Sequence, residues 1–150
     1  MEQKHRKLNI ALFSVYGIFM LWLLFDRVGG IDGILYWDQI RMNLNLEPFH
    51  TIRLFLNALG NHTYRVTAVI NLGGNVIMFI PLGFFLPQVF PALQKFWRTI
   101  LVTTLIITAV ELTQLFSLLG CCDIDDLILN VLGAAIGYSI FILHTKKPAQ

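Results

Sequence analysis

Long apolar stretches alternate with polar connections along this chain, and the stretches have the length that membrane helices need. Four of them cover residues 8–25, 67–86, 99–119 and 124–143. A helix needs about 20 predominantly apolar residues to cross the hydrocarbon core of a bilayer. The pattern therefore predicts an all-α membrane protein, a four-helix transmembrane bundle in which residues 1–150 form one domain.

The first stretch follows the basic run Lys4-His5-Arg6-Lys7, and a secretory signal peptide would begin in the same way. The apolar stretch is long for a signal peptide, and no small-x-small cleavage site follows it cleanly. Both observations favour a first helix that is retained in the protein.

The first connection, residues 26–66, is long and polar, but it contains the apolar piece Ile52–Leu59. This piece is too short to span a bilayer. It predicts an interfacial or re-entrant segment that lies at the level of the lipid headgroups.

Composition supports the membrane class. Hydrophobic residues make up 56% of the chain and charged residues only 13%, whereas a soluble domain carries about 25% charged residues. The sequence has no basic stripe interleaved with aromatic residues, which argues against nucleic acid as a partner. Cys121 and Cys122 are adjacent and lack the CxxC spacing of a metal or redox pair. Composition thus predicts the lipid bilayer as a partner and leaves the oligomeric state open.

Lysine and arginine residues flank the predicted helices unevenly. They lie before the first helix, in the second connection at Lys95 and Arg98, and after the last helix at Lys146 and Lys147. The third connection, within residues 120–126, has none. Because basic residues stay on the cytoplasmic side, this distribution predicts a multi-pass protein with both termini in the cytoplasm. The four arginines of the first connection are the one discordant feature.

Strongly polar side chains interrupt the last three stretches, at the end that this topology places outside. Asn71 and Asn75 are spaced i, i+4 and Glu111 and Gln114 are spaced i, i+3, so each pair shares a helix face. A charged residue at the centre of a membrane helix costs about 2.5–3.5 kcal/mol on insertion scales, and such residues usually face one another or a wet cavity. We therefore predict one outward-facing polar site. Its members are Asn71, Asn75, Glu111, Gln114, Asp123, Asp126 and Asn130.

Purely structural roles remain open for several of these residues. Asparagines in membrane helices often only hydrogen-bond to neighbouring helices. Asp123 and Asp125 are placed to cap the helix that follows and to complement its dipole. Asp126 and Asn130 lie deeper, where capping explains them less well. Glu111 is the hardest to explain structurally, because a carboxyl inside an apolar helix needs protonation, a cation or a basic partner.

The chemistry of the predicted site leaves its ligand open. Carboxylate and amide oxygens suit Mg²⁺ or Ca²⁺, with Glu111 and Asp126 as the candidate metal ligands. Such an ion could hold the phosphate of a headgroup, and arginines could hold it directly. The candidates for that direct contact are Arg41, Arg53 and Arg65. The sequence has no Ser-His-Asp set, HExxH, P-loop or dinucleotide fingerprint, so catalytic residues and enzymatic activity stay unassigned.

The last stretch also contains Gly133 and Gly137, which have the GxxxG spacing. Small residues at this spacing let two membrane helices approach closely. As a signal for dimers the motif is weak, so we expect it to pack against another helix of the same chain.

Taken in order, these motifs resemble the VanZ-like family of small bacterial membrane proteins. The resemblance covers about residues 43–138. It rests on the segments Asn45-Leu46-Glu47-Pro48-Phe49, Asn71-Leu72-Gly73-Gly74-Asn75, Phe79-Ile80-Pro81-Leu82-Gly83, Glu111-Leu112-Thr113-Gln114, Asp123-Ile124-Asp125-Asp126 and Asn130-Val131-Leu132-Gly133. Many members carry an arginine just before the DxDD element, where this chain has Gly120-Cys121-Cys122.

The resemblance implies a multi-pass protein of the bacterial cytoplasmic membrane. The family takes its name from a protein that gives low-level resistance to teicoplanin, and such glycopeptides bind cell-wall precursors outside the membrane. Our leading hypothesis is a protein that binds or modifies the headgroup of an envelope lipid or of a cell-wall precursor at the outer leaflet. Anionic lipids are among the candidate partners. The alternatives are a membrane enzyme that acts on a headgroup through a carboxylate or metal site, and a small transporter or flippase. The apolar inner halves of the helices count against a flippase.

Overall fold

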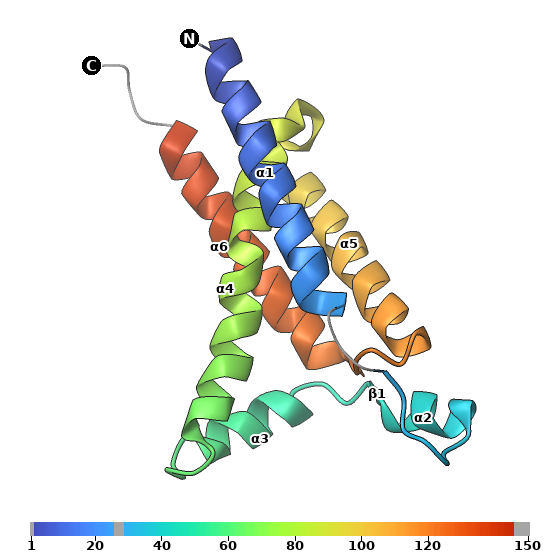
Figure 1. Ribbon diagram of the computed structural model, residues 1–150. Helices are drawn as coiled ribbons and strands as arrows, with labels where there is room; N and C mark the ends of the chain where they lie inside the picture. Colours follow the sequence, from blue (N-terminus) through green and yellow to red (C-terminus); the bar gives the residue numbers. More distant parts are fainter. Residues whose placement is uncertain (1, 26–28, 146–150) are drawn as a thin grey trace.

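A computed structural model describes residues 2–25 and 29–145, with side chains from Arg6 onward (Figure 1). Its framework is formed by four long helices. They are α1 (Glu2–Phe25), α4 (Arg65–Val89), α5 (Phe96–Phe116) and α6 (Ile124–Thr145). Within the described ranges, these four are long and apolar enough to cross a membrane. The predicted all-α membrane architecture is therefore confirmed.

Shorter elements lie mainly at one end of the bundle. They are α2 (Tyr36–Met42), β1 (Leu44–Asn45), α3 (His50–Ala58), the 3-10 turn η1 (Pro91–Leu93) and β2 (Cys122–Asp123). Figure 1 shows α2, β1 and α3 at the end opposite to the start of α1 and the end of α6. Helix α3 coincides with the predicted apolar piece Ile52–Leu59, whereas α2 and the short parallel pair of β1 and β2 were not predicted.

Helix α5 ends earlier than its apolar sequence suggests. We predicted the span to continue to residue 119, but the helix ends at Phe116. The Leu119 N–H donates to the Gln114 carbonyl at 2.9 Å, and Leu118 takes a left-handed φ of 58°. This is the hydrogen-bonding pattern of a Schellman C-cap, which usually places glycine at the left-handed position. Because leucine and not glycine occupies this position, the apolar sequence gives no sign that the helix ends there.

Three glycines allow α4 and α6 to cross at backbone contact distance. A Cβ atom on Gly83 of α4 would overlap the carbonyl oxygen of Ala134 on α6. In the same way, Cβ atoms on Gly133 and Gly137 would overlap the carbonyl oxygens of Val76 and Ile80. Small residues at such crossings provide the van der Waals packing that holds membrane helices together. The GxxxG pair therefore packs within the chain, as expected.

Helix α1 packs against this pair through a small apolar core and two polar contacts. Met20 is buried with Phe79 and Leu82 of α4 and with Ile107 of α5. The Tyr16 hydroxyl donates to the Met78 carbonyl at 2.8 Å. The Asn9 amide donates to Gln88 Oε1 at 2.7 Å. Many other apolar side chains of α1 are exposed, as expected for a helix that borders lipid.

Candidate functional site

A cleft of about 410 Å³ lies among the four long helices, in the halves that lead toward α2 and α3. Its walls come from α1, α4, α5 and α6 and from the connection at Gly120 and Cys121. Six of the seven predicted polar residues line it. These are Asn71, Asn75, Glu111, Gln114, Asp126 and Asn130. Asp123, the seventh, is not among the lining residues.

On the α4 wall, the two asparagines behave differently. Asn75 donates a hydrogen bond from Nδ2 to Asp126 Oδ1 on α6, so it links two walls of the cleft. Asn71 donates from Nδ2 to the Thr67 carbonyl of its own helix at 2.9 Å. A purely structural role for these asparagines requires a hydrogen bond to a neighbouring helix. Asn75 makes such a bond, whereas the bond that Asn71 donates stays within α4.

The α5 wall carries a carboxylate and an amide. Glu111 is 8% exposed and lines the cleft from a helix that is long and apolar enough to cross a membrane. Gln114 donates from Nε2 to the Leu24 carbonyl at 2.8 Å, in the last turn of α1. The last carbonyls of a helix lack partners within the helix, so Gln114 satisfies one of them and anchors α1.

The α6 wall contributes Asp126 and Asn130, which are spaced i, i+4 and both line the cleft. Asn130 is only 3% exposed. Its Oδ1 atom is buried and accepts no hydrogen bond from the part of the chain that the structure describes. Buried polar atoms normally have a partner, and this oxygen belongs to a residue that lines the cleft.

Asp123 holds the first connection against the start of α6. Its Oδ1 atom accepts the Asp125 N–H at 2.8 Å, which is an N-cap of α6. Its Oδ2 atom accepts the Thr51 hydroxyl at 2.6 Å and the Asn45 amide at 3.0 Å. Asp123 therefore fastens β1 and α3 to α6 and does not face the cleft.

Asp125 caps a different helix from the one it belongs to. It is 0% exposed, and its two carboxylate oxygens accept the backbone N–H groups of Phe49 and Ile52 at the start of α3. Phe49 precedes α3 with a left-handed φ of 65° and supplies no side-chain cap. In the sequence, the start of α3 lacks a capping residue of its own, which indicates that another residue caps it. The sequence does not indicate that this residue is Asp125.

The three arginines proposed for headgroup contact do not line the cleft. Arg41 is exposed beside Asp38, at 3.8 Å between Nη1 and Oδ1. Arg65 donates from Nε to the Leu59 carbonyl at 2.9 Å, and the Arg53 side chain is exposed on α3. Among the described residues, no lysine, arginine or histidine lines the cleft.

Metal-ligand chemistry at the cleft is limited to two carboxylates. Within residues 6–25 and 29–145, no three His, Cys, Asp or Glu side chains gather closely enough to hold an ion. Glu111 and Asp126 both line the cleft, and amide oxygens would have to complete any shell of Mg²⁺ or Ca²⁺.

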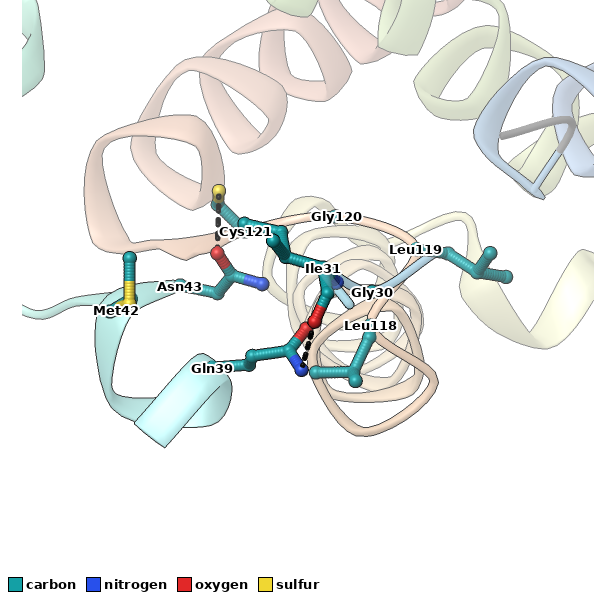
Figure 2. A pocket seen from close by; sticks show the side chains of 9 residues that line it. All are labelled: Gly30, Ile31, Gln39, Met42, Asn43, Leu118, Leu119, Gly120 and Cys121. Carbon is teal, nitrogen blue, oxygen red and sulfur yellow. Dashed lines mark hydrogen bonds between the residues drawn. The ribbon is translucent and has the colours of Figure 1, made fainter. Parts of the chain in front are cut away.

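A smaller cavity of about 240 Å³ adjoins the cleft at the end of the bundle (Figure 2). Gly120 and Cys121 line both hollows. In the smaller one, Gln39 accepts the Ile31 N–H at 2.7 Å and donates to the Ile31 carbonyl at 3.1 Å, which fixes the turn before α2. The Cys121 Sγ atom lies 3.8 Å from Asn43 Oδ1. The connection between α5 and α6 therefore forms the wall that the two hollows share.

The two cysteines occupy different surroundings in this wall. Cys121 is exposed, whereas Cys122 is half-buried. Burial raises the pKa of the Cys122 thiol above its usual value, and the nearby carboxylates of Glu111 and Asp123 raise it further. A raised pKa reduces the thiolate fraction at neutral pH, so both burial and pKa lower the reactivity of Cys122.

Comparison with known proteins places these features in a family. The family model described as VanZ/LLP1 matches residues 13–145. Protein VanZ of Enterococcus faecium is 29% identical over 144 residues, which cover 95% of this chain and 79% of that protein. No solved structure matches the chain.

Proposed function

The chain belongs to the VanZ/LLP1 family, and on that premise we propose that its cleft binds the polar headgroup of an envelope lipid or cell-wall precursor. The observation that carries the proposal is a buried polar cleft bordered by side chains suited to lipid. Glu111 is buried inside, whereas Ile70 lines the same cleft and is 65% exposed. A molecule with a polar head and an apolar tail matches both parts of this surface.

The proposed orientation places the cleft in the outer leaflet of the bacterial cytoplasmic membrane, with both termini in the cytoplasm. The start of α1, the end of α6 and the connection between α4 and α5 lie at one end of the bundle in Figure 1. The sequence places Lys95 and Arg98 in or beside that connection. Basic residues at one end, and a polar cleft in the other half, support this orientation.

This orientation predicts that a membrane-impermeant maleimide labels Cys121 in whole cells. The cytoplasmic membrane of these cells must be intact, and the reagent must reach its outer face. At pH 7, a Cys122→Ser variant should label faster than a Cys121→Ser variant, because Cys121 is exposed, whereas Cys122 is half-buried and has a raised pKa. The rate for Cys121→Ser should rise as the pH approaches the raised pKa of Cys122. Labelling of Cys121 only by a permeant reagent would contradict the orientation.

We expect Glu111→Gln to abolish headgroup binding while the protein still inserts, because the variant keeps the shape of the side chain and removes its charge. Native mass spectrometry of the purified protein would show a co-purifying amphiphile on the parent and lose that mass on the variant. In cells, teicoplanin susceptibility at matched expression provides the second readout. An Asp38→Asn variant, which changes an exposed carboxylate beside Arg41, is the matched control.

Two results would separate the competing functions. If Glu111→Gln retains the amphiphile but no longer converts it to a product, the cleft belongs to an enzyme that acts on the headgroup. If the variant binds the same amphiphile and confers the same susceptibility as the parent, the carboxylate is structural and the proposal is wrong.

A further inference from the structure

We infer that the group entering the cleft is a primary ammonium, carried on the headgroup of an envelope amphiphile. This inference rests on the proposed function and specifies the chemistry of its ligand. It is carried by the charges of the lining residues and by the balance of hydrogen-bond donors and acceptors in the cleft.

The chargeable side chains that line the cleft from α5 and α6 are acidic. Glu111 and Asp126 project from α5 and α6 into the same hollow. No cationic side chain among the described residues lines it, and the three candidate arginines of the first connection lie elsewhere. A cation would stabilise the ionised form of both carboxyl groups, whereas the negative charge of a phosphate would oppose it.

Three amides of the cleft each donate a hydrogen bond within the chain. Asn75 donates to Asp126, Asn71 to the Thr67 carbonyl and Gln114 to the Leu24 carbonyl. Asn130 Oδ1, by contrast, is a buried acceptor that receives no hydrogen bond from the described residues. A ligand that supplies donors would satisfy this oxygen, and one that brings only acceptors would not.

An ammonium group fits this supply better than a divalent ion does. It has three N–H donors and no acceptor. Glu111, Asp126 and Asn130 offer it acceptors from two helices. Mg²⁺ and Ca²⁺ need six or more oxygen ligands, and no cluster of three metal-binding side chains occurs in the part of the chain that the structure describes. An aminophospholipid would place its ammonium inside and its phosphate toward the mouth.

The test measures binding of short-chain lipids to the purified full-length protein in detergent with EDTA present. Dihexanoyl phosphatidylethanolamine is compared with dihexanoyl phosphatidylglycerol and with the N-acetylated ethanolamine lipid, which loses the positive charge. We expect the ethanolamine lipid to bind at least about tenfold more tightly than either, because charge-assisted hydrogen bonds to carboxylates are the strong ones. This comparison uses the unmodified chain, so it does not depend on the folding of any variant.

Two variants then locate the effect. Glu111→Gln and Asp126→Asn should each reduce the preference for the ethanolamine lipid by about tenfold or more. Asp38→Asn should leave it unchanged, because that carboxylate is on the exposed face of α2.

The outcomes separate this inference from the proposed function. Equal binding of the glycerol and ethanolamine lipids, lost in Glu111→Gln, would overturn the ammonium assignment and leave headgroup binding intact. Binding that appears only when Mg²⁺ or Ca²⁺ replaces EDTA would also overturn it, in favour of a metal ion. If free ethanolamine binds as tightly as the ethanolamine lipid, the ligand carries an ammonium group but the lipid tail is not recognised, and the amphiphile part of the inference is wrong. No binding of any lipid would overturn both.

Discussion

Replacing Gly137 by alanine should force α4 and α6 apart at their crossing and lower the stability of the folded protein. The added Cβ atom would overlap the Ile80 carbonyl oxygen, which belongs to backbone and cannot rotate away. Overpacking of a well-packed interior costs about 1–3 kcal/mol, and the helices would have to separate to relieve it. Thermal unfolding in detergent, followed by loss of monodisperse protein, measures the effect. We expect a lower unfolding temperature at unchanged expression.

Gly73→Ala is the matched control for this prediction. It makes the same chemical change within α4, and nothing lies within 4 Å of a Cβ atom at that position. Alanine is favoured over glycine in a helix by about 1 kcal/mol, so this variant should be at least as stable as the parent. Equal stability of Gly137→Ala and Gly73→Ala would show that α4 and α6 do not cross at backbone contact.

Asp125→Ala should release α3 from the start of α6 and destabilise the first connection. The substitution leaves the N–H groups of Phe49 and Ile52 without the carboxylate that accepts them. Each buried donor left unsatisfied costs about 1–3 kcal/mol, so the two together predict a loss of about 2–6 kcal/mol. Hydrogen exchange of the α3 amides and limited proteolysis between β1 and α4 would report the release.

The adjacent acid provides the comparison. Asp126 follows Asp125 directly but lines the cleft and accepts from Asn75. Asp126→Asn should therefore leave exchange in α3 close to that of the parent and affect ligand binding. If both variants release α3 to the same extent, the two acids do not have the separate roles that the structure assigns to them.

The long helices were predictable because each has a local cause in the sequence. A run of apolar residues of membrane-spanning length predicts a helix whatever surrounds it. Polar residues at helical spacing also drew attention to Asn75, Glu111 and Asp126, which line one cleft in the structure. The GxxxG pair similarly indicated a close helix crossing, although it could not name α4 as the partner.

Other features depend on contacts between distant segments and left little trace in the local pattern. Asp125 lies in the first turn of α6, yet it caps α3 far earlier in the chain. The left-handed Leu118 ends α5 within an apolar run that still reads as helix. Arg41, Arg53 and Arg65 were candidates for headgroup contact, but none of them lines the cleft, and Arg65 donates to the Leu59 carbonyl.

The crossing of α4 and α6 also imposes an order in time on the newly made protein. Helix α4 is synthesised after α1, and α5 follows before α6 is made. Until then, Gly83 of α4 and the Asn75 amide lack their partners Ala134 and Asp126. A chain whose synthesis stops before residue 124 would have α1, α4 and α5 but would lack the α6 wall of the cleft. The close helix crossing and the Asn75–Asp126 hydrogen bond can therefore form only after the last helix has been made.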